Sequence, residues 1–302
     1  MEQTTVARSV EWRGTGLHSG RPALVAVRPA DPDTGLVFRV AQAAGRPPIA
    51  IPAKADHVHS STRATTLAAA GGQASVATVE HLLAALFALG IHNAWIDVEG
   101  GEVPALDGSA APFAVRLRRA GRRRLAASRR SLAIEDPLEI ALDDRWIRVE
   151  PAAALSIDYT IDFPHPAIGR QRHVVARLDR DVFGSTLAPA RTFGFAAEVD
   201  RLRAQGLARG GDLANTLVLD GDGLLNREPL RFVDEFVRHK IVDLLGDLAL
   251  LGGDLAARIT VERGGHVLHH AMVSALVERF ERDRARGVGA PPALRRATAQ
   301  PA

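Results

Sequence analysis

In the first half of the chain, hydrophobic residues form short runs and then a longer run with helical spacing. Short apolar runs bounded by turn residues predict strands at residues 21–28, 35–40 and 93–98. Between residues 78 and 89 the pattern predicts a helix, with Thr78 as N-cap and Gly90 directly after its end. The turn-rich sequence GGEVPALDGSAAPF completes this half.

The second half shows the same order of short apolar runs followed by helical patterns. Strands are predicted at residues 131–134, 138–141, 146–149, 155–163, 215–219 and 258–262. Helices are predicted around Asp181 and at residues 195–205, 231–251 and 267–284. Strands followed by helices in both halves indicate an α+β fold of two domains that are structurally related, although no sequence repeat links the halves.

The sequence RLRRAGRRRLAASRR at residues 116–130 contains eight arginines and separates the two halves. We interpret it as a helix end followed by a solvated linker, with domains at residues 1–125 and 131–302 and the linker at residues 126–130. A patch for anionic lipid or nucleic acid is the alternative. The run lacks the interleaved aromatic residues of a single-strand binder.

Composition narrows the class of protein. The 302 residues are enough for two hydrophobic cores, and a net charge of +3 does not indicate a nucleic-acid-binding protein. The absence of cysteine excludes disulfides, thiolate metal sites and a cysteine nucleophile. The sequence MEQTTVARSVEW lacks a signal-peptide pattern, and the longest apolar run, residues 82–91, is too short to span a membrane. We therefore expect a cytoplasmic protein.

One predicted helix combines an apolar surface with a polar stripe. Within VRHKIVDLLGDLALLG, His239, Asp243 and Asp247 are four residues apart and lie within roughly 80° of one another. A helix this apolar is buried, and buried ionisable groups need partners or a metal. The spacing of the first two allows both to bind one zinc ion, and a direct histidine–aspartate contact is the alternative.

Other histidines offer weaker signals. In VEHLLAALFALG, Glu80 and His81 begin a helix, where they are either site residues or a capping glutamate beside a packed histidine. In RGGHVLHH, the glycine pair places His266 at a helix start. We expect the next two histidines, His269 and His270, on the helix surface, and His57 and His59 to share a strand face in a structural role.

Taken together, the segments resemble the zinc-dependent UDP-3-O-acyl-N-acetylglucosamine deacetylases, which catalyse the committed step of lipid A biosynthesis in Gram-negative bacteria. The similarity runs in the family's order from Gly14 to His266. The matching segments are GTGLHSG, TRATTL, TVEHLLAAL, EVPALDGSAAPF, TIDFPHPAI, ARTFGF, LNREPLRFVDEFVRHKIVDLLGDLALLG and GGH. The departures from the family pattern, at His92, Ala105, Leu106 and Asp212, do not fall on a metal ligand.

The resemblance implies a catalytic mechanism. One zinc ion per chain, or iron(II) in cells, would be held by His81, His239 and Asp243 with water in the fourth position. Glu80 would be the general base. His266 would be the general acid, oriented and kept charged by the carboxylate of Asp247, and the hydroxyl of Thr192 would help to hold the oxyanion.

The resemblance also implies a substrate, UDP-3-O-(3-hydroxyacyl)-N-acetylglucosamine, whose N-acetyl group would be hydrolysed to release acetate. Lys240, which we expect to point about 100° away from the ligands, and Arg263 would meet the diphosphate. An aromatic pair, Phe163 and Phe193, would contact the substrate, with the former stacking on uracil. An insert at about residues 197–219 would form an apolar passage for the acyl chain, lined by residues such as Val199, Leu202 and Leu207.

The implied architecture has two helix layers packed face to face between two outer sheets, with the site in the interdomain cleft. We expect a monomer with a small-molecule substrate, no nucleic-acid partner and at most peripheral contact with the inner membrane. A zinc amidase or peptidase of another family is disfavoured by the TIDF and ARTFGF segments. An inactive homologue is disfavoured because Glu80 and all three proposed ligands are present.

Overall fold

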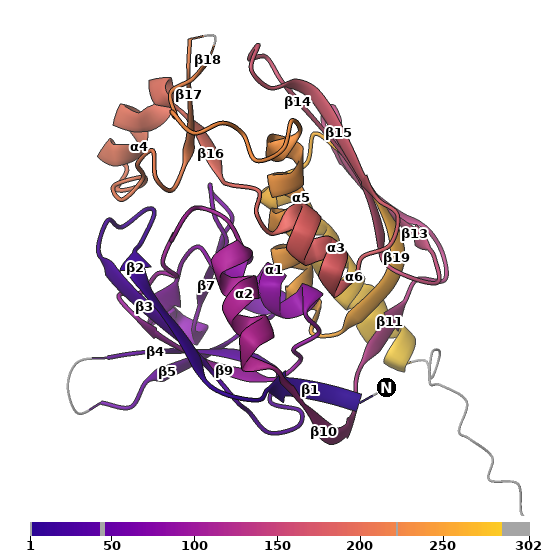
Figure 1. Cartoon of the computed structure of the whole chain (residues 1–302). Helices are drawn as coiled ribbons and strands as arrows, with labels where there is room; N and C mark the ends of the chain where they lie inside the picture. The colour runs from indigo at the N-terminus through magenta and orange to yellow at the C-terminus, as the bar shows by residue number, and fades with distance from the viewer. Residues whose placement is uncertain (1, 43–45, 222, 286–302) are drawn as a thin grey trace, which may run out of the picture.

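The computed structural model describes residues 2–42, 46–221 and 223–285. Two mixed β-sheets lie on the outside and helices fill the space between them (Figure 1). In the first sheet the strands, in spatial order, are β2 (Val10–Thr15), β3 (Pro22–Arg28), β9 (Ala94–Glu99), β4 (Leu36–Val40) and β5 (Ile49–Pro52). In the second the order is β12 (Leu138–Leu142), β13 (Arg145–Pro151), β19 (Asp254–Glu262), β14 (Ser156–Phe163) and β15 (Gly169–Val175).

The two sheets share one topology. In each, an antiparallel hairpin pairs with a central strand that comes last in sequence, and a second hairpin pairs with the other side of that strand in parallel. A short strand also runs parallel to the start of each central strand: β11 (Ser131–Ala133) pairs with β19, and Thr5 of β1 (Glu2–Val6) forms a parallel bridge with Asn93. The halves are therefore built alike although their sequences show no repeat.

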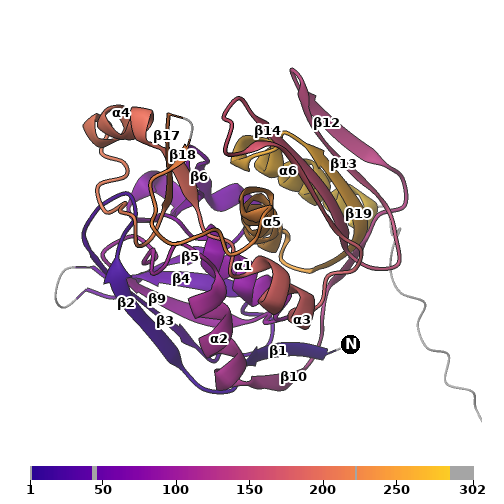
Figure 2. The same ribbon diagram turned by 45° about the horizontal axis from the view of Figure 1, so that its top comes forward.

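The longer helices lie in the layer between the sheets (Figures 1 and 2). They are α1 (Glu80–Ala88), α2 (Ala111–Ala120), α5 (Glu235–Leu248) and α6 (His266–Ala285). Both α1 and α5 are buried on nearly every side, which is why their sequences are apolar all round. The α+β fold class and the helices packed between outer sheets agree with the prediction.

Helices α1 and α5 approach each other closely at one glycine. A Cβ atom added at Gly246 would lie 2.2 Å from the carbonyl oxygen of Glu80 and 2.7 Å from its Cα. Real side chains do not tolerate such distances, so the first turn of α1 rests directly on the backbone of α5. This contact places Glu80 and His81 beside the polar stripe of α5.

Smaller elements surround this frame. A three-stranded sheet contains β6 (Val58–Ser60), β7 (Thr66–Ala68) and β8 (Ser75–Val76). Another contains β16 (Phe193–Phe195), β17 (Leu217–Asp220) and β18 (Gly223–Leu224), and it carries α4 (Val199–Ala204). A short helix, α3 (Arg180–Val182), continues into a further helical turn at Phe183–Leu187. No helix within the described ranges is long and apolar enough to cross a membrane.

Several local predictions were wrong. Much of the arginine-rich run is not a linker, because β10 (Arg122–Ser128) pairs antiparallel with β1, leaving only residues 129 and 130 before β11. The helix predicted at residues 195–205 is shorter, because Phe195 ends β16 and residues 196–198 form a 3₁₀ turn, so that α4 covers only Val199–Ala204. The two histidines of the HVH segment do not share a strand face. His57 ends a 3₁₀ turn, and its Nδ1 donates to the carbonyl oxygen of Ala68 at 3.0 Å, whereas His59 is an exposed residue of β6.

The start of α1 also differs from the prediction. Thr78 is not the N-cap: the N-cap is Val79, and the Thr78 hydroxyl donates to Glu102 Oε1 at 2.9 Å. The backbone of Thr78 has φ +57°, which is unfavourable for a β-branched residue. Its bond to Glu102 holds this conformation, and the same carboxylate accepts from the backbone N–H groups of His18 and Ser19.

Candidate metal centre and surrounding residues

Two histidines and one aspartate converge where α1 meets α5. His81 Nε2 lies 3.6 Å and His239 Nε2 lies 3.4 Å from Asp243 Oδ1. The three ligand atoms lie within 4.8 Å of one another, and all three residues are buried. The nitrogen–oxygen distances exceed those of good hydrogen bonds, which leaves the three atoms directed at a common point rather than paired tightly with each other.

The surroundings prepare these groups for metal binding. His239 Nδ1 donates to the carbonyl oxygen of Ala190 at 3.0 Å, so Nε2 carries the free lone pair that a metal requires. Burial lowers the pKa of His239 to about 4, which keeps its ring neutral. Burial opposes ionisation of Asp243, but the charges of Lys240 and His266 help to hold the pKa of Asp243 well below its usual range.

This donor set has the composition of a catalytic zinc site, which uses three nitrogen and oxygen ligands and leaves one position open. The expectation that Lys240 points away from the ligands was wrong. Its Nζ lies 2.8 Å from Asp243 Oδ2, because residues three apart on a helix are neighbours and the flexible lysine side chain folds back. Lys240 therefore supports the carboxylate directly.

A second buried cluster surrounds Asp247. Its Oδ2 accepts from His266 Nδ1 at 2.8 Å and from His269 Nδ1 at 2.9 Å. These short distances describe a hydrogen-bonded cluster, in contrast to the first group, although the same three residues are also close enough to surround an ion. Burial opposes ionisation of Asp247, but the charges of His266 and His270 outweigh it, so the pKa of Asp247 lies far below its usual value.

Electrostatics favours a charged His266. Burial alone would lower the pKa of His266, but the charge and hydrogen bond of Asp247, together with Asp243 and Glu80, raise it to about 9. His266 Nε2 lies 3.9 Å from Glu80 Oε1 and 3.9 Å from Asp243 Oδ2. The ring is therefore held by Asp247 on one side and faces the first cluster on the other.

Glu80 lies between the clusters and is not among the three converging ligand residues. Burial raises the pKa of Glu80, and the charges of His266 and His81 oppose the rise. The Oε2 atom accepts from the backbone N–H of Thr65 at 3.1 Å, which leaves Oε1 on the side of His266. A carboxylate with a raised pKa beside a candidate metal centre has the character of a general base.

The prediction that His269 and His270 lie on the helix surface was wrong. Both are buried, with exposed fractions of 0% and 9%. His269 donates from Nδ1 to Asp247, so its Nε2 accepts from the hydroxyl of Tyr159 at 2.9 Å. Because α6 packs against α5 and the second sheet, its first turn is enclosed on more sides than sequence periodicity indicates.

Aromatic residues border the first cluster. The Phe193 ring lies 5.6 Å from the Phe163 ring, 6.4 Å from the His239 ring and 6.0 Å from Lys240 Nζ. This arrangement brings together Phe163, Phe193 and Lys240, for which the family resemblance implies contact with the substrate. Arg263 directly follows β19, and its guanidinium is paired with Asp162 at 2.7 Å and with Asp144.

The segment that carries Thr192 connects the two halves. Its backbone N–H donates to Gly108 at 2.8 Å and its carbonyl accepts from Leu217, while Ala190, two residues earlier, holds His239. Residues 193–220, which comprise β16, α4 and β17, are called the α4 unit below, and Leu202 and Leu207 are half-buried in it. Figure 1 shows α4 at one end of the molecule near β2 and β3. Backbone bonds from residues 209 and 210 to His18 and Leu17 fix this unit to the first half.

Thr65, Tyr159 and His269 are buried neighbours of the site that the sequence analysis did not assign. Thr65 lies within the TRATTL segment, and Tyr159 directly precedes the TIDF segment. Their partners are distant in sequence: Thr65 bonds Asp247, 182 positions away, and Tyr159 bonds His269, 110 positions away. Local patterns carry no signal for such contacts.

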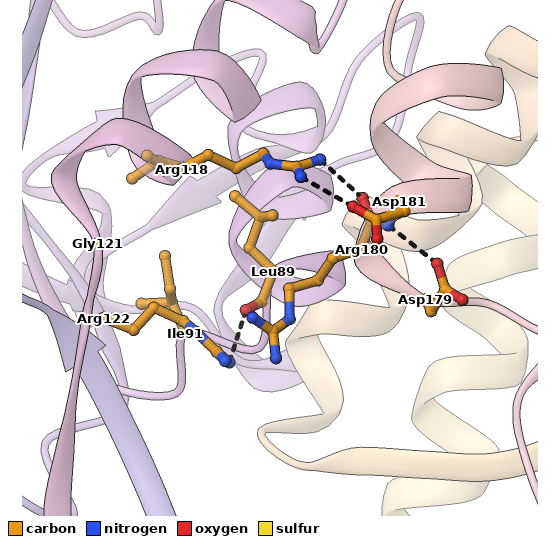
Figure 3. A pocket seen from close by; sticks show the side chains of 9 residues that line it. Leu89, Ile91, Arg118, Gly121, Arg122, Asp179, Arg180 and Asp181 are labelled. Atoms are coloured by element: carbon orange, nitrogen blue, oxygen red, sulfur yellow. Dashed lines mark hydrogen bonds and ion pairs between the residues drawn. The ribbon is translucent and has the colours of Figure 1, made fainter.

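Two cavities lie away from these clusters. One of about 590 Å³ is found at the C-terminal end of α1, where Leu89 and Ile91 meet Arg118, Arg122 and residues of α3 (Figure 3). Another of about 570 Å³ is lined by residues that include His92, Asp254 and Glu281. Neither is lined by the residues of the two clusters, so the converging side chains, and not cavity size, define the candidate site.

Comparison with known proteins agrees with this geometry. A family model described as UDP-3-O-acyl N-acetylglycosamine deacetylase (LpxC) matches residues 3–278. Three relatives named UDP-3-O-acyl-N-acetylglucosamine deacetylase illustrate the similarity. The protein of Geotalea uraniireducens is 43% identical over 279 residues, covering 92% of this chain and 89% of the relative. The protein of Anaeromyxobacter sp. is 44% identical over 271 residues, covering 90% of this chain and 87% of the relative. The protein of Nitratidesulfovibrio vulgaris is 45% identical over 278 residues, covering 92% of this chain and 88% of the relative.

The family model spans both sheets and both buried clusters, since it extends from β1 into α6. The relatives share this extent at more than two-fifths identity, and their length is nearly fully covered. The chain belongs to the UDP-3-O-acyl-N-acetylglucosamine deacetylase family.

Proposed function

We propose that this chain is a zinc-dependent amidohydrolase that removes the N-acetyl group of UDP-3-O-(3-hydroxyacyl)-N-acetylglucosamine and releases acetate, as a step of lipid A biosynthesis. The observation that carries the proposal is the convergence of His81, His239 and Asp243, all buried, beside a buried glutamate and an aspartate-bound histidine. Family membership supplies the substrate class.

The proposed metal ligands are His81, His239 and Asp243. The neutral ring of His239 and the ionised carboxylate of Asp243 are the forms in which these groups bind a metal. Two imidazoles and a carboxylate suit zinc, and iron(II) is the alternative ion in cells. When bound, the ion would polarise the amide carbonyl and lower the pKa of a water molecule at its open position.

The remaining steps belong to side chains of the chain. Glu80 accepts the proton of the attacking water, a role for which its raised pKa suits it. His266 donates a proton to the nitrogen of the leaving amine, and Asp247 holds it in the charged form by bonding Nδ1. The hydroxyl of Thr192 donates to the developing oxyanion. Because Asp247 bonds Nδ1, the opposite nitrogen, Nε2, is the one that faces the first cluster.

We assign substrate binding to the residues around this centre. Lys240 and Arg263 contact the diphosphate. To bind Arg263, the diphosphate must compete with Asp162 for the guanidinium. Phe163 and Phe193 contact the uridine end through their paired rings. Leu202 and Leu207 line the passage for the acyl chain, because they supply apolar surface on the α4 unit.

We further propose two domains, at residues 1–125 and 131–302, of which residues 286–302 lie outside the described part of the chain. The shared topology of the two sheets supports this division. The protein would act as a cytoplasmic monomer, with its contact to the inner membrane limited to the periphery.

One assay tests the function. Purified protein is incubated with UDP-3-O-(3-hydroxyacyl)-N-acetylglucosamine and acetate release is followed, with and without a chelator. Release that stops on chelation and returns with one equivalent of zinc per chain is expected. Release that persists after complete metal removal would exclude the metal centre, and no release by the zinc-loaded protein would exclude the substrate.

A further inference from the structure

We infer that Thr65 is a positioning residue that holds two carboxylates of the proposed site, Glu80 through its backbone and Asp247 through its side chain. This inference rests on the proposed function. Thr65 lies in the loop between β6 and β7 and is fully buried. It reaches the two carboxylates from a part of the chain that supplies neither of them, since Glu80 belongs to α1 and Asp247 to α5.

The backbone contact determines which oxygen of Glu80 is free. Thr65 N–H donates to Oε2 at 3.1 Å, so that atom is occupied by a hydrogen bond. The other oxygen, Oε1, lies on the side of His266, 3.9 Å from Nε2. The backbone of Thr65 therefore orients Glu80 so that Oε1 is the atom that accepts a proton during the reaction.

The hydroxyl contact determines the orientation of Asp247. Thr65 Oγ1 donates its one proton to Asp247 Oδ1 at 2.6 Å, while Oδ2 accepts from His266 and His269. With both oxygens held, the carboxylate has a fixed rotation. Oδ2 consequently stays aligned with His266 Nδ1, and Nε2 of that ring stays directed at the first cluster.

The same hydroxyl separates Asp247 from a competing histidine. Because its proton goes to Asp247, Oγ1 acts as the acceptor for His270 Nε2 at 2.9 Å. His270 Nε2 lies 3.3 Å from Asp247 Oδ1. Without the hydroxyl, His270 would satisfy its N–H on Asp247 directly and rotate the carboxylate away from His266. The hydroxyl thus positions the proposed general acid, His266, by way of Asp247, and the backbone N–H positions the proposed general base, Glu80.

A set of four variants tests the role of the hydroxyl. Thr65→Val keeps the backbone N–H and the volume of the side chain but removes the hydroxyl, Thr65→Ser keeps the hydroxyl, and Thr65→Ala is the smaller hydroxyl-free form. Thr66→Val is the matched control, because Thr66 is the adjacent residue and its side chain forms no hydrogen bond among the described residues.

We expect Thr65→Val to retain one zinc per chain and its KM within about threefold, while kcat falls about 10- to 100-fold, the usual effect of losing a group that orients a site residue. Thr65→Ser should stay within about threefold of the parent protein, and Thr66→Val should be unchanged. Wild-type kcat in Thr65→Val would overturn the inference. If Thr65→Val fails to fold, the ratio of kcat between Thr65→Ser and Thr65→Ala decides, and a ratio near one overturns it.

A second readout does not depend on activity. Long-range ¹H–¹⁵N spectra of the histidine rings, recorded on the zinc-loaded protein at one pH, should show changed His270 and His266 signals in Thr65→Val and unchanged signals in Thr66→Val. Unchanged His270 signals in a folded Thr65→Val protein contradict the network. If the parent protein releases no acetate, the proposed function fails, whereas the spectra still decide whether Thr65 holds this network.

Discussion

At the scale of single residues, the same chemical groups take different roles because their neighbours differ. Asp243 and Asp247 are one helical turn apart on α5, and both are buried. Asp243 is supported by Lys240 and faces two ring nitrogens across 3.4 and 3.6 Å, which leaves it available to a metal. Asp247 accepts three short hydrogen bonds, which commits it to orienting its partners.

This difference predicts separable effects of substitutions on metal content and rate. His239→Ala removes one of the three proposed ligands, so both zinc and activity should be lost. Glu80→Gln removes a proton acceptor without removing a ligand, so zinc should remain while kcat falls about 10²- to 10⁴-fold. Metal analysis together with the acetate assay checks both variants. A Glu80→Gln protein that purifies without zinc would show that Glu80 belongs to the metal centre.

The electrostatics of His266 predicts the alkaline side of the pH profile. Asp247 holds the pKa of His266 at about 9, above the ordinary value of 6.5, so the proton-donating form is present below that pH and is lost as the pH rises through it. The kcat/KM of the parent protein should therefore fall at high pH. In His266→Gln the alkaline limb should flatten and the rate fall about 10²- to 10⁴-fold with zinc content unchanged. An unaltered alkaline limb in this variant would assign the acid role to another group.

At the scale of elements, the sequence was most informative where the pattern is local. The apolar helices near residues 80 and 240 and the strands β3, β4, β13 and β14 follow from spacing and turn residues, and their ends agree within a few positions. Strand β10 was missed because its arginines resemble a solvated linker, whereas its place is set by pairing with β1 more than a hundred residues earlier. The three predicted metal ligands come together in the structure, but Thr65, Tyr159 and His269 needed the tertiary structure to be found.

The contact between α1 and α5 predicts an effect of one added methyl group. Alanine normally favours a helix over glycine by about 1 kcal/mol, but a Cβ at Gly246 would lie 2.2 Å from the Glu80 carbonyl oxygen. Gly246→Ala should therefore lower the free energy of unfolding by about 1–3 kcal/mol and displace the first turn of α1, reducing zinc affinity. Chemical denaturation and zinc titration measure these two effects.

Gly265→Ala provides the matched control, because an added Cβ there meets nothing within 4 Å. Its stability should stay close to that of the parent protein. A Gly246→Ala protein as stable as the parent, with unchanged zinc affinity, would mean that the two helices separate freely and that their close approach does not set the site.

At the scale of the whole molecule, the site is assembled from both halves of the chain. The first half supplies Glu80, His81 and Thr65, and the second supplies the proposed ligands of α5 and the histidines of α6. The α4 unit belongs to the second half but is fixed to the first through the backbone of His18 and Leu17, and Arg63 forms an ion pair with Glu198 at 2.7 Å. A substrate that contacts this unit therefore meets a surface held by both halves.

That arrangement predicts strong selectivity for the acylated substrate. UDP-N-acetylglucosamine retains the amide and both phosphates, so it tests what the acyl chain adds. Burying a methylene contributes about 0.8 kcal/mol, and about five methylenes in the passage would contribute about 4 kcal/mol, or roughly 10³ in kcat/KM. Such remote binding energy also holds the amide in place at the reacting centre. We expect the acylated substrate to be preferred by at least about 10³, and comparable kcat/KM values for the two substrates would contradict the passage.

Substitutions at Leu202 and Leu207 test where the acyl chain binds. Both are half-buried on the α4 unit, so Leu202→Asp or Leu207→Asp places a charge where the acyl chain would lie. Each variant should lower kcat/KM for the acylated substrate about 10- to 100-fold, because a carboxylate replaces apolar contact, and should leave turnover of UDP-N-acetylglucosamine unchanged. Leu142→Asp is the control, since Leu142 is an exposed residue of β12 in the second sheet, 41% accessible to solvent. Equal losses on both substrates would show that α4 supports the fold or the zinc centre, and that the acyl chain binds along another surface.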